Sequence, residues 1–292
     1  MTVPTPGVWR VGAVTVTRVV EQHMTVLPAR LLSAATEEGV RAIQWLSPDH
    51  ADRDGLLHMS IQSLVIRTPS CVVVVDTCVG DDREGLDHAR WNGMKTAFLQ
   101  DFTAGGMTRE AVDVVLCTHL HADHIGWNTM RVDGGWRPTF PNARYLIDRT
   151  EYEHWRAHAN EGEVGALLRQ SLEPIEAAGL LELIDARRGY GICDEVKLTP
   201  TPGHTPGHVS VRITSQGETA LITGDAIHHP CQMARPEWGS GADCDSVRAE
   251  RSRRELLAGC ESHGTLLIGT HFAGDPTGHV RREGEAWRFE QG

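Results

Sequence analysis

The sequence predicts one layered domain of mixed strands and helices, in the α/β or α+β class. Strand-like runs of alternating or β-branched residues begin early and recur along all 292 residues. Helix-like segments lie between these runs, which is the pattern of a layered mixed domain. No Pro-, Gly- or Ser-rich linker divides the chain, so we expect a single domain over residues 1–292.

The first half of the chain supplies five expected strands and three helical regions. The strands are expected at residues 12–20, 63–68, 71–77, 112–117 and 143–148, and the helices at 89–102, 149–159 and 162–179. Thr68, Pro69 and Ser70 form a hairpin-like turn between two of these strands. Residues 21–58 show no clear strand pattern. They are a candidate lid or dimer arm, or an ordinary loop with a short helix.

The second half of the chain has shorter, regularly spaced strand signals. Strands are expected at residues 196–201, 209–214, 219–225 and 265–271, followed by a closing hairpin over 280–290 that turns at Glu283-Gly284. A charged amphipathic helix is expected at residues 246–260.

Composition and charge exclude several classes of protein. A hydrophobic content of 40% is that of a globular chain, and a net charge of −11 argues against a nucleic-acid partner. No run approaches the roughly 18 apolar residues of a membrane helix, and the N-terminus lacks the pattern of a signal peptide. Seven cysteines without a CxxC pair fit reduced thiols. We therefore expect a soluble cytoplasmic protein with no membrane partner.

Residues 117–128, CTHLHADHIGWN, gather four potential metal ligands within six positions. These are His119, His121, Asp123 and His124, which directly follow the apolar run VDVVLC. The group is either a polar surface turn or a metal site. A loop after a strand favours the second interpretation, because a rigid sheet holds such residues in place.

Three more ligand-type residues follow expected strands. His204 lies in TPTPGHTPGH, Asp225 in LITGDA and His271 in LLIGTH. We expect these three strand ends and the strand end before His119 to bring the ligand-type residues to one rim of the fold. Imidazole and carboxylate groups suit zinc, and less exclusively iron or manganese. Two ions that share one hydroxide would lower its pKa and create a nucleophile near neutral pH.

The motif HLHADH matches the H-x-H-x-D-H pattern of the metallo-β-lactamase superfamily. The downstream TPGHTPGH, GD and GTH elements resemble its later motifs in the same order, and Asp76 resembles its early aspartate. The resemblance covers roughly residues 60–290. It implies an α/β fold, a four-layer αββα sandwich, with a dinuclear metal site at one edge of the sheets.

The resemblance also implies a role for each ligand. His119, His121 and His204 would bind the first ion; Asp123, His124 and His271 would bind the second; and Asp225 would bridge them. Asp76 would orient a ligand histidine or its loop. The expected cofactors are two divalent ions, with Zn²⁺ preferred over iron or manganese.

Departures from the branches of the superfamily narrow the expected activity. Zinc β-lactamases generally lack the bridging aspartate, whereas Asp225 is present here. The added regions of nucleases, glyoxalase II and flavin-linked diiron proteins find no counterpart in this chain. Lactonases, esterases and methyl-parathion-type hydrolases remain. Acyl-homoserine lactonases usually place a tyrosine three residues after the bridging aspartate, and His228 stands there instead. His228 is a candidate hydrogen-bond donor to a developing oxyanion, or simply a loop residue like His229.

The sequence therefore predicts a metal-dependent hydrolase acting on a small neutral lactone or carboxylic ester by attack of a metal-bridging hydroxide. Asp123 and His228 are the candidate catalytic residues, with Asp123 relaying a proton to the leaving group. The alternatives are an organophosphate triesterase and, from another class, an iron-dependent oxidoreductase such as a sulfur dioxygenase. The expected partner is a small-molecule substrate, and the apolar N-terminal segment motivates a homodimer. Met24, Trp45, Trp127 and Trp238 would either line an apolar pocket or pack in the core.

Overall fold

The computed structural model describes residues 7–291 and divides into two compact units. Unit 1 comprises residues 1–21 and 61–185, and unit 2 comprises residues 22–60 and 186–292. Two of the three boundaries between the units fall inside β2 (Val14–Val26) and β3 (Leu57–Arg67), and the third lies between residues 185 and 186. The single domain over residues 1–292 stays a prediction.

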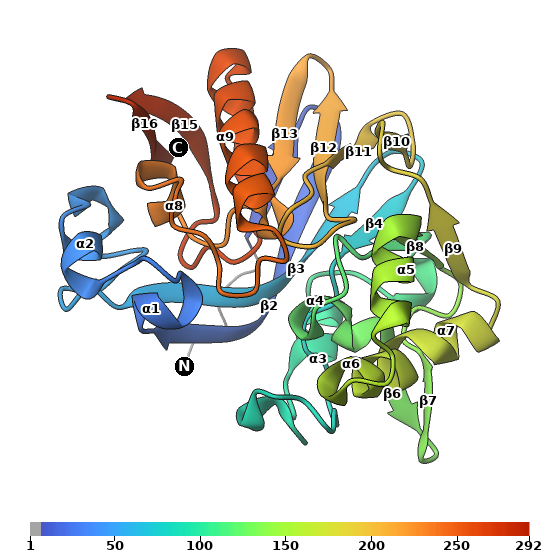
Figure 1. Ribbon diagram of the computed structural model, residues 1–292. Coiled ribbons are helices and arrows are strands. Elements are labelled where there is room, and N and C mark those ends of the chain that lie inside the picture. Colours follow the sequence, from blue (N-terminus) through green and yellow to red (C-terminus); the bar gives the residue numbers. More distant parts are fainter. Residues whose placement is uncertain (1–6, 292) are drawn as a thin grey trace. The chain divides into compact units, whose positions relative to one another are not determined.

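Unit 1 is built on a seven-stranded sheet in the order β1-β2-β3-β4-β5-β8-β9 (Figure 1). Besides β2 and β3 its strands are β1 (Val8–Val11), β4 (Val72–Val75), β5 (Val114–Leu116), β8 (Arg144–Asp148) and β9 (Leu181–Ile184). The strands from β4 to β9 are parallel, so helical crossovers join them.

The connections of unit 1 carry short helices and one hairpin. The helical elements are η2 (Ala89–Trp91), α3 (Phe98–Ala104), η3 (Arg109–Ala111), α4 (Ala122–Ile125), η4 (Gly126–Asn128), α5 (Arg149–Ala157), α6 (Gly162–Leu167), η5 (Leu168–Leu172) and α7 (Glu173–Ala177). The hairpin pairs β6 (Thr129–Val132) with β7 (Gly135–Pro138).

Unit 2 is built on a second seven-stranded sheet whose strands follow one another in chain order. They are β10 (Tyr190–Gly191), β11 (Val196–Pro200), β12 (Val209–Ser215), β13 (Glu218–Ile222), β14 (Leu266–Ile268), β15 (Thr277–Glu283) and β16 (Ala286–Gln291). All neighbours are antiparallel except β13 and β14, which are parallel. The helical elements are α1 (Pro28–Leu31), α2 (Glu37–Arg41), η1 (Gln44–Leu46), η6 (Gly224–Ala226), α8 (Cys231–Ala234) and α9 (Ser246–His263).

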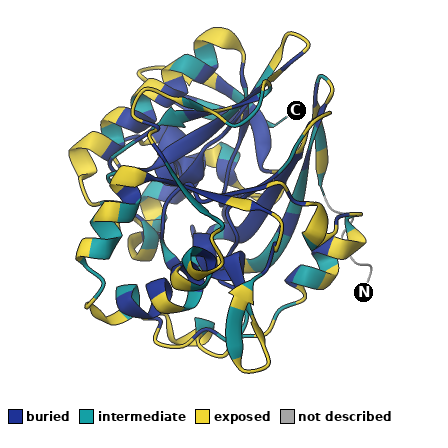
Figure 2. Ribbon diagram, turned by 90° about the vertical axis from the view of Figure 1, so that its right-hand side faces the viewer, coloured by how far each residue is buried: buried dark blue, intermediate teal, exposed yellow. Residues whose placement is uncertain are grey.

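Two apolar clusters form the core of unit 2. In the first, Leu256 and Leu257 of α9, the long helix labelled in Figure 1, cluster with Leu267 and Val280 of the sheet. In the second, Leu32 and Leu46 pack with Trp238 near α8, so the segment 32–57 contributes to the core of unit 2. In Figure 2 the strands are mostly coloured as buried, whereas the helices carry buried, intermediate and exposed residues. A role of residues 21–58 as a lid or dimer arm stays a prediction.

Most expected elements are confirmed, and the differences have local causes. The helix expected over residues 89–102 is wrong in its centre, because Gly93 adopts a left-handed φ of +66° between η2 and α3. The helical region 162–179 contains a π-helical turn at η5, just before Pro174, which has no N–H to donate. The strand expected over 265–271 ends at Ile268, so His271 lies in the following loop.

The closing hairpin is confirmed as β15 and β16, with Gly284 at a left-handed φ of +62° in the turn. The hairpin of β6 and β7, the short strands β1, β9 and β10, and the extension of β2 to Val26 were not expected. Within residues 7–291, no helix combines the length and the apolar character needed to cross a bilayer.

Candidate metal centre

Parallel strand ends position the ligand group of unit 1, by which we mean the candidate ligands His119, His121, Asp123 and His124. Because β4 and β5 are parallel neighbours, their carboxyl ends lie at the same edge of the sheet. Asp76 follows β4, and the loop that carries His119 follows β5. The Asp76 backbone N–H donates to the carbonyl oxygen of Leu116, which fixes the two strand ends together at 2.9 Å.

The buried carboxylate of Asp76 organises this loop. It accepts hydrogen bonds from the Thr118 backbone N–H (2.7 Å), the Thr118 hydroxyl (2.8 Å) and Nδ1 of His124 (2.9 Å). Asp76 has a φ of +56°, a strained conformation for a residue with a side chain. The contacts that the resemblance implied for Asp76, with a ligand histidine and with its loop, are both present.

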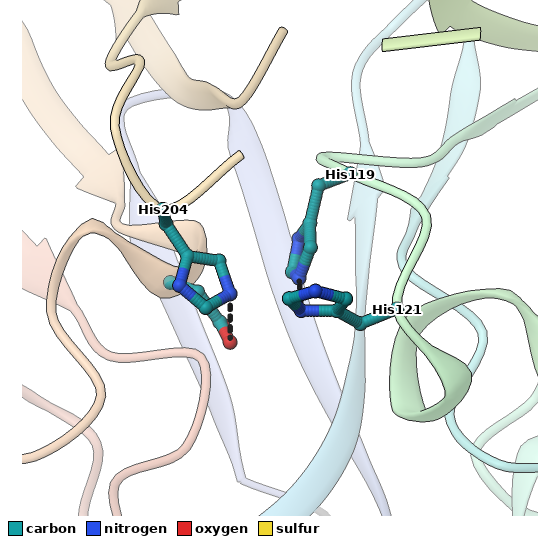
Figure 3. A group of neighbouring side chains, drawn as sticks. His119, His121 and His204 are labelled. Carbon is teal, nitrogen blue, oxygen red and sulfur yellow. Dashed lines mark hydrogen bonds and ion pairs between the residues drawn. The ribbon is translucent and has the colours of Figure 1, made fainter. Parts of the chain in front are cut away.

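These contacts also fix the protons on two histidine rings. His124 donates its Nδ1–H to Asp76, which leaves the Nε2 lone pair facing Oδ1 of Asp123 at 3.6 Å. The Thr118 hydroxyl donates to Asp76, so its oxygen accepts from Nδ1 of His119 at 3.1 Å. The Nε2 lone pair of His119 then faces Nδ1 of His121 at 3.0 Å (Figure 3). Both rings present a lone pair, as metal-ligating imidazoles do.

The loop that follows β5 is packed closely against residues 79–80 and β2. Gly126 permits no side chain, because a Cβ there would lie 1.7 Å from the carbonyl oxygen of Val79. The carboxylate of Glu21 accepts from the backbone N–H of Val79 (2.8 Å) and from the indole of Trp127 (2.7 Å). Trp127 also stacks on Phe98 at a centroid distance of 5.4 Å. Trp127 is therefore a packing residue of unit 1.

Glu151 was not anticipated from the sequence and supports the other side of the loop. Its buried carboxylate accepts from the Leu120 backbone N–H (3.0 Å) and from the Trp155 indole (2.6 Å). The Trp155 ring meets His121 edge to face at 5.3 Å. A Glu-x-x-x-Trp spacing on an expected helix is too common a pattern to reveal this role.

The directions of the strands also bring together the ligand group of unit 2, which consists of the candidate ligands His204, Asp225 and His271. β11 and β13 are both antiparallel to β12, so they run in the same direction, and β14 is parallel to β13. His204, Asp225 and His271 each follow the carboxyl end of one of these strands. Within unit 2 these three strand ends bring the residues to one rim, and the expectation that the strand end before His119 reaches the same rim stays a prediction.

Three imidazoles surround the buried carboxylate of Asp225. Its Oδ2 lies 3.5 Å from Nε2 of His204, a contact marked in Figure 3, and 3.2 Å from Nε2 of His228. Its Oδ1 lies 3.1 Å from Nε2 of His271. The two oxygens therefore face different histidines, as they would in a carboxylate that bridges two ions.

The far nitrogens of two of these rings are held by acceptors. Nδ1 of His271 donates to the backbone carbonyl of Ser60 at 2.9 Å, and Nδ1 of His204 donates to the Asp243 carboxylate at 2.8 Å. In their neutral forms both rings turn an Nε2 lone pair toward the Asp225 carboxylate. Acceptors at this distance repel one another unless a cation lies between them. The donor set of unit 2 therefore fits a divalent metal ion.

The backbone of Asp225 is positioned by the second histidine of TPGHTPGH. Nε2 of His208 accepts the Asp225 N–H at 2.8 Å, while Nδ1 of His208 donates to Thr201. Gly224 has a φ of +53°, and a Cβ there would lie 2.5 Å from His208 Nε2. The Gly-Asp pair thus allows the loop to approach His208 closely.

His228 and His229 have different surroundings. His229 is fully buried; it donates Nε2–H to the His50 carbonyl (2.8 Å) and accepts the Cys231 N–H (3.1 Å). Burial lowers the pKa of His229 to about 3, so this ring is a neutral structural group. His228 instead contacts Asp225, and its buried Nδ1 has no hydrogen-bond partner among residues 7–291.

Asp243 and Arg253 were also missed from the sequence. Both side chains are fully buried, and the Arg253 guanidinium donates to the carbonyl oxygens of Ala226 (2.9 Å) and Pro236 (2.5 Å). Burial raises the pKa of Asp243, although His228 and Arg253 oppose the shift. The stretch GADCD offers no spacing that would mark Asp243 as the partner of His204.

The remaining pocket candidates are mostly packing residues. Trp238 is buried in the second core cluster of unit 2, and Trp45 is half-buried against both clusters. Met24 is half-buried in β2. None of these residues belongs to either ligand group described above.

Comparisons with known proteins agree with these features. The family model of the metallo-beta-lactamase superfamily matches residues 59–259. The N-acyl homoserine lactonase AiiA of Bacillus thuringiensis subsp. kurstaki is 32% identical over 115 residues, which cover 39% of this chain and 38% of that protein. The chain thus matches about two fifths of the length of this curated relative.

Two solved structures share the fold over almost the whole chain. The hydrolase AbOPH of the beta lactamase superfamily is 22% identical, with a TM-score of 0.81 and coverage of 99% of this chain and 98% of that chain. AidC, a dizinc quorum-quenching lactonase, is 19% identical, with a TM-score of 0.80 and coverage of 97% and 96%. These findings confirm the expected fold class, and the chain belongs to the metallo-beta-lactamase superfamily.

Proposed function

We propose that the chain is a dinuclear metal hydrolase that opens a small neutral lactone or cleaves a carboxylic ester. In this proposal His119, His121 and His204 hold one ion; Asp123, His124 and His271 hold the other; and Asp225 bridges both. The ions are Zn²⁺, with iron or manganese as alternatives. Family membership supports this assignment, as do the ligand chemistry of each unit and the match to the family motifs.

The observation that carries the proposal is that, within each unit, an imidazole Nε2 lone pair faces a carboxylate oxygen at close range. Nε2 of His271 faces a carboxylate oxygen of Asp225 at 3.1 Å, and Nε2 of His124 faces Asp123 at 3.6 Å. Nδ1 of His271 donates to the carbonyl oxygen of Ser60, and Nδ1 of His124 donates to the carboxylate of Asp76. Imidazoles that are oriented in this way from behind are the usual ligands of catalytic zinc.

When bound, two such ions would supply a hydroxide nucleophile near neutral pH and would polarise the carbonyl group under attack. The chain's own residues orient this chemistry. Asp76 and Asp243 orient the rings of His124 and His204 and hold the proton on Nδ1 of each. His208 and Gly224 set the position of Asp225.

We assign proton transfer to Asp123. Its side chain is 21% exposed, whereas His124 beside it is 1% exposed, so Asp123 is the more accessible of the two to a leaving group. A carboxylate in that position can hold a proton and pass it to the departing alkoxide. His228 is the candidate donor to the developing oxyanion, because a neutral His228 can carry its proton on either ring nitrogen.

The substrate class follows from the relatives and from the charge of the chain. AiiA and AidC are named as lactonases, and the net charge of −11 disfavours polyanionic substrates. His228 in place of the tyrosine that acyl-homoserine lactonases usually carry separates this chain from the standard members. We therefore propose lactones and esters as a class rather than one acyl-homoserine lactone.

The test is proton release in a pH-stat with the zinc-loaded protein. The panel contains an acyl lactone, an aryl ester, a methyl phosphotriester and a penicillin. A His121→Ala variant is the control, because it lacks one proposed ligand and should lose at least about 100-fold in turnover. Turnover of the lactone or ester, lost in the variant, is the expected result.

Preference for the phosphotriester would reject the carboxyl-ester proposal in favour of a triesterase. Equal turnover by the wild-type protein and by His121→Ala would reject the metal-dependent mechanism itself. A protein that carries one iron ion and turns over none of the four compounds would favour an oxidoreductase.

A further inference from the structure

Unit 2 contains a cavity of about 520 Å³ whose lining residues belong to neither ligand group. Residues 42–45, at and before η1, form one wall. Ala234 and Arg235, at the end of α8, form a second wall, and Glu283, Ala286 and Arg288 of the β15–β16 hairpin form a third. A cavity of this volume matches those that hold small organic ligands.

Two guanidinium groups at this cavity lack a carboxylate partner. Among residues 7–291, Arg288 makes no ion pair, and its Nε is buried without a hydrogen-bond partner. Arg235 is exposed, and its side chain donates to the carbonyl oxygen of the adjacent Ala234, at 3.4 Å. By contrast, Arg281 on the same hairpin pairs with Glu290 at 2.8 Å. The half-buried Arg288, whose Nε has no hydrogen-bond partner, and the exposed Arg235 therefore offer cationic groups to an anionic occupant.

The rest of the lining is mixed: Gln44 is polar and exposed, and the other residues except Glu283 are apolar. Ile43 is buried, Trp45 and Ala286 are half-buried, and Ala234 is 9% exposed. An indole ring provides a flat contact surface for an aromatic or aliphatic body. Glu283 is the one carboxylate in the lining, so the two arginines leave a net charge of +1. This arrangement matches a single negative charge joined to an apolar group.

We propose that this cavity binds a small monoanionic organic acid. Its carboxylate would accept hydrogen bonds from Arg288, assisted by Arg235, because a guanidinium fork matches a carboxylate in geometry and charge. Its apolar body would lie against Trp45 and Ile43. The site is separate from the proposed hydrolase activity and does not depend on it.

The test is isothermal titration calorimetry of the zinc-loaded full chain with 1-naphthoate and with the neutral 1-naphthamide. The expected result is one site for naphthoate and at least about tenfold weaker binding of the amide. Arg288→Met should weaken naphthoate binding by at least about tenfold. Arg282→Met is the matched control, because Arg282 lies on the opposite face of the hairpin, over Trp287, and should leave binding unchanged.

Arg288→Lys gives a second measurement that does not require removal of the charge, and it should bind naphthoate with intermediate affinity. If Arg288→Met does not fold, Arg235→Met takes its place with the same expected direction. Equal affinities for acid and amide would overturn the proposal, as would undetectable binding at about 5 mM ligand. Naphthoate binding that survives Arg288→Met but disappears when zinc is chelated would place the anion at the metal centre and would also overturn it.

Discussion

The buried pair of His229 and His50 predicts a specific loss of stability in acid. Burial lowers the pKa of His229 to about 3 and that of His50 to about 4, against an ordinary value of 6.5. The unfolded chain therefore binds protons that the folded chain excludes. Because the folded pKa values are depressed, the stabilisation is complete above pH 6.5 and is lost as the pH falls below that value.

The magnitude follows from the His229 pKa alone. Each pH unit below 6.5, down to about 3, lowers the free energy of unfolding by about 1.4 kcal/mol. A fall from pH 7.5 to pH 5.0 therefore lowers it by about 2 kcal/mol through this one group. His229→Gln abolishes the titration but keeps an amide that can donate to His50 and accept from Cys231. The variant should be less stable than the wild-type protein at pH 7.5, and the gap should narrow by about 2 kcal/mol at pH 5.0.

The assay is urea unfolding at both pH values in the presence of a chelator, which removes the contribution of metal binding. The difference between the unfolding free energies of the wild-type protein and the variant cancels the contributions of the other titrating groups. His263→Gln is the control, since His263 is exposed on α9 and should leave the pH dependence unchanged. A gap between wild type and His229→Gln that is the same at pH 7.5 and pH 5.0 would refute the reasoning.

Two further predictions concern the positioning of the ligands. Gly224→Ala places a Cβ 2.5 Å from His208 Nε2 and should lower the free energy of unfolding in urea by about 2–4 kcal/mol. Gly284→Ala is the control, because Gly284 has a similar φ but open space around it, and it should cost only about 1 kcal/mol. Equal losses would refute the close approach. Asp243→Asn should weaken zinc binding by about 10- to 100-fold in a chelator competition, because His204 loses the charged acceptor for its Nδ1–H, and an unchanged affinity would refute that role.

The sequence predicted the ligand groups because their signals are local. HLHADH places four candidate ligands in one short loop, and the apolar runs before His204, Asp225 and His271 mark the strands that carry them. Other apolar or β-branched runs predicted β2, β3, β4, β5, β8 and β12. The hairpin of β6 and β7 was missed because its residues are largely exposed or half-buried and show no apolar alternation.

The supporting residues could not be found in this way because their partners are distant in sequence. Asp243 lies 39 residues from His204, and Glu21 lies 106 residues from Trp127. A single buried carboxylate leaves no periodic pattern, so only the folded chain identifies it. His208 lies in the repeated TPGH but was not singled out either, because its role in holding Asp225 depends on the conformation of Gly224.

The central claim is that seven residues hold two metal ions in one hydrolytic centre. Its most direct test is the metal content per chain after loading with excess zinc and gel filtration, measured by inductively coupled plasma mass spectrometry. We predict two zinc ions in the wild-type protein and about one in His271→Ala, in which one proposed ligand of the second ion is lost. One ion or none in the wild-type protein, or two ions retained in His271→Ala at the wild-type affinity, would contradict the account.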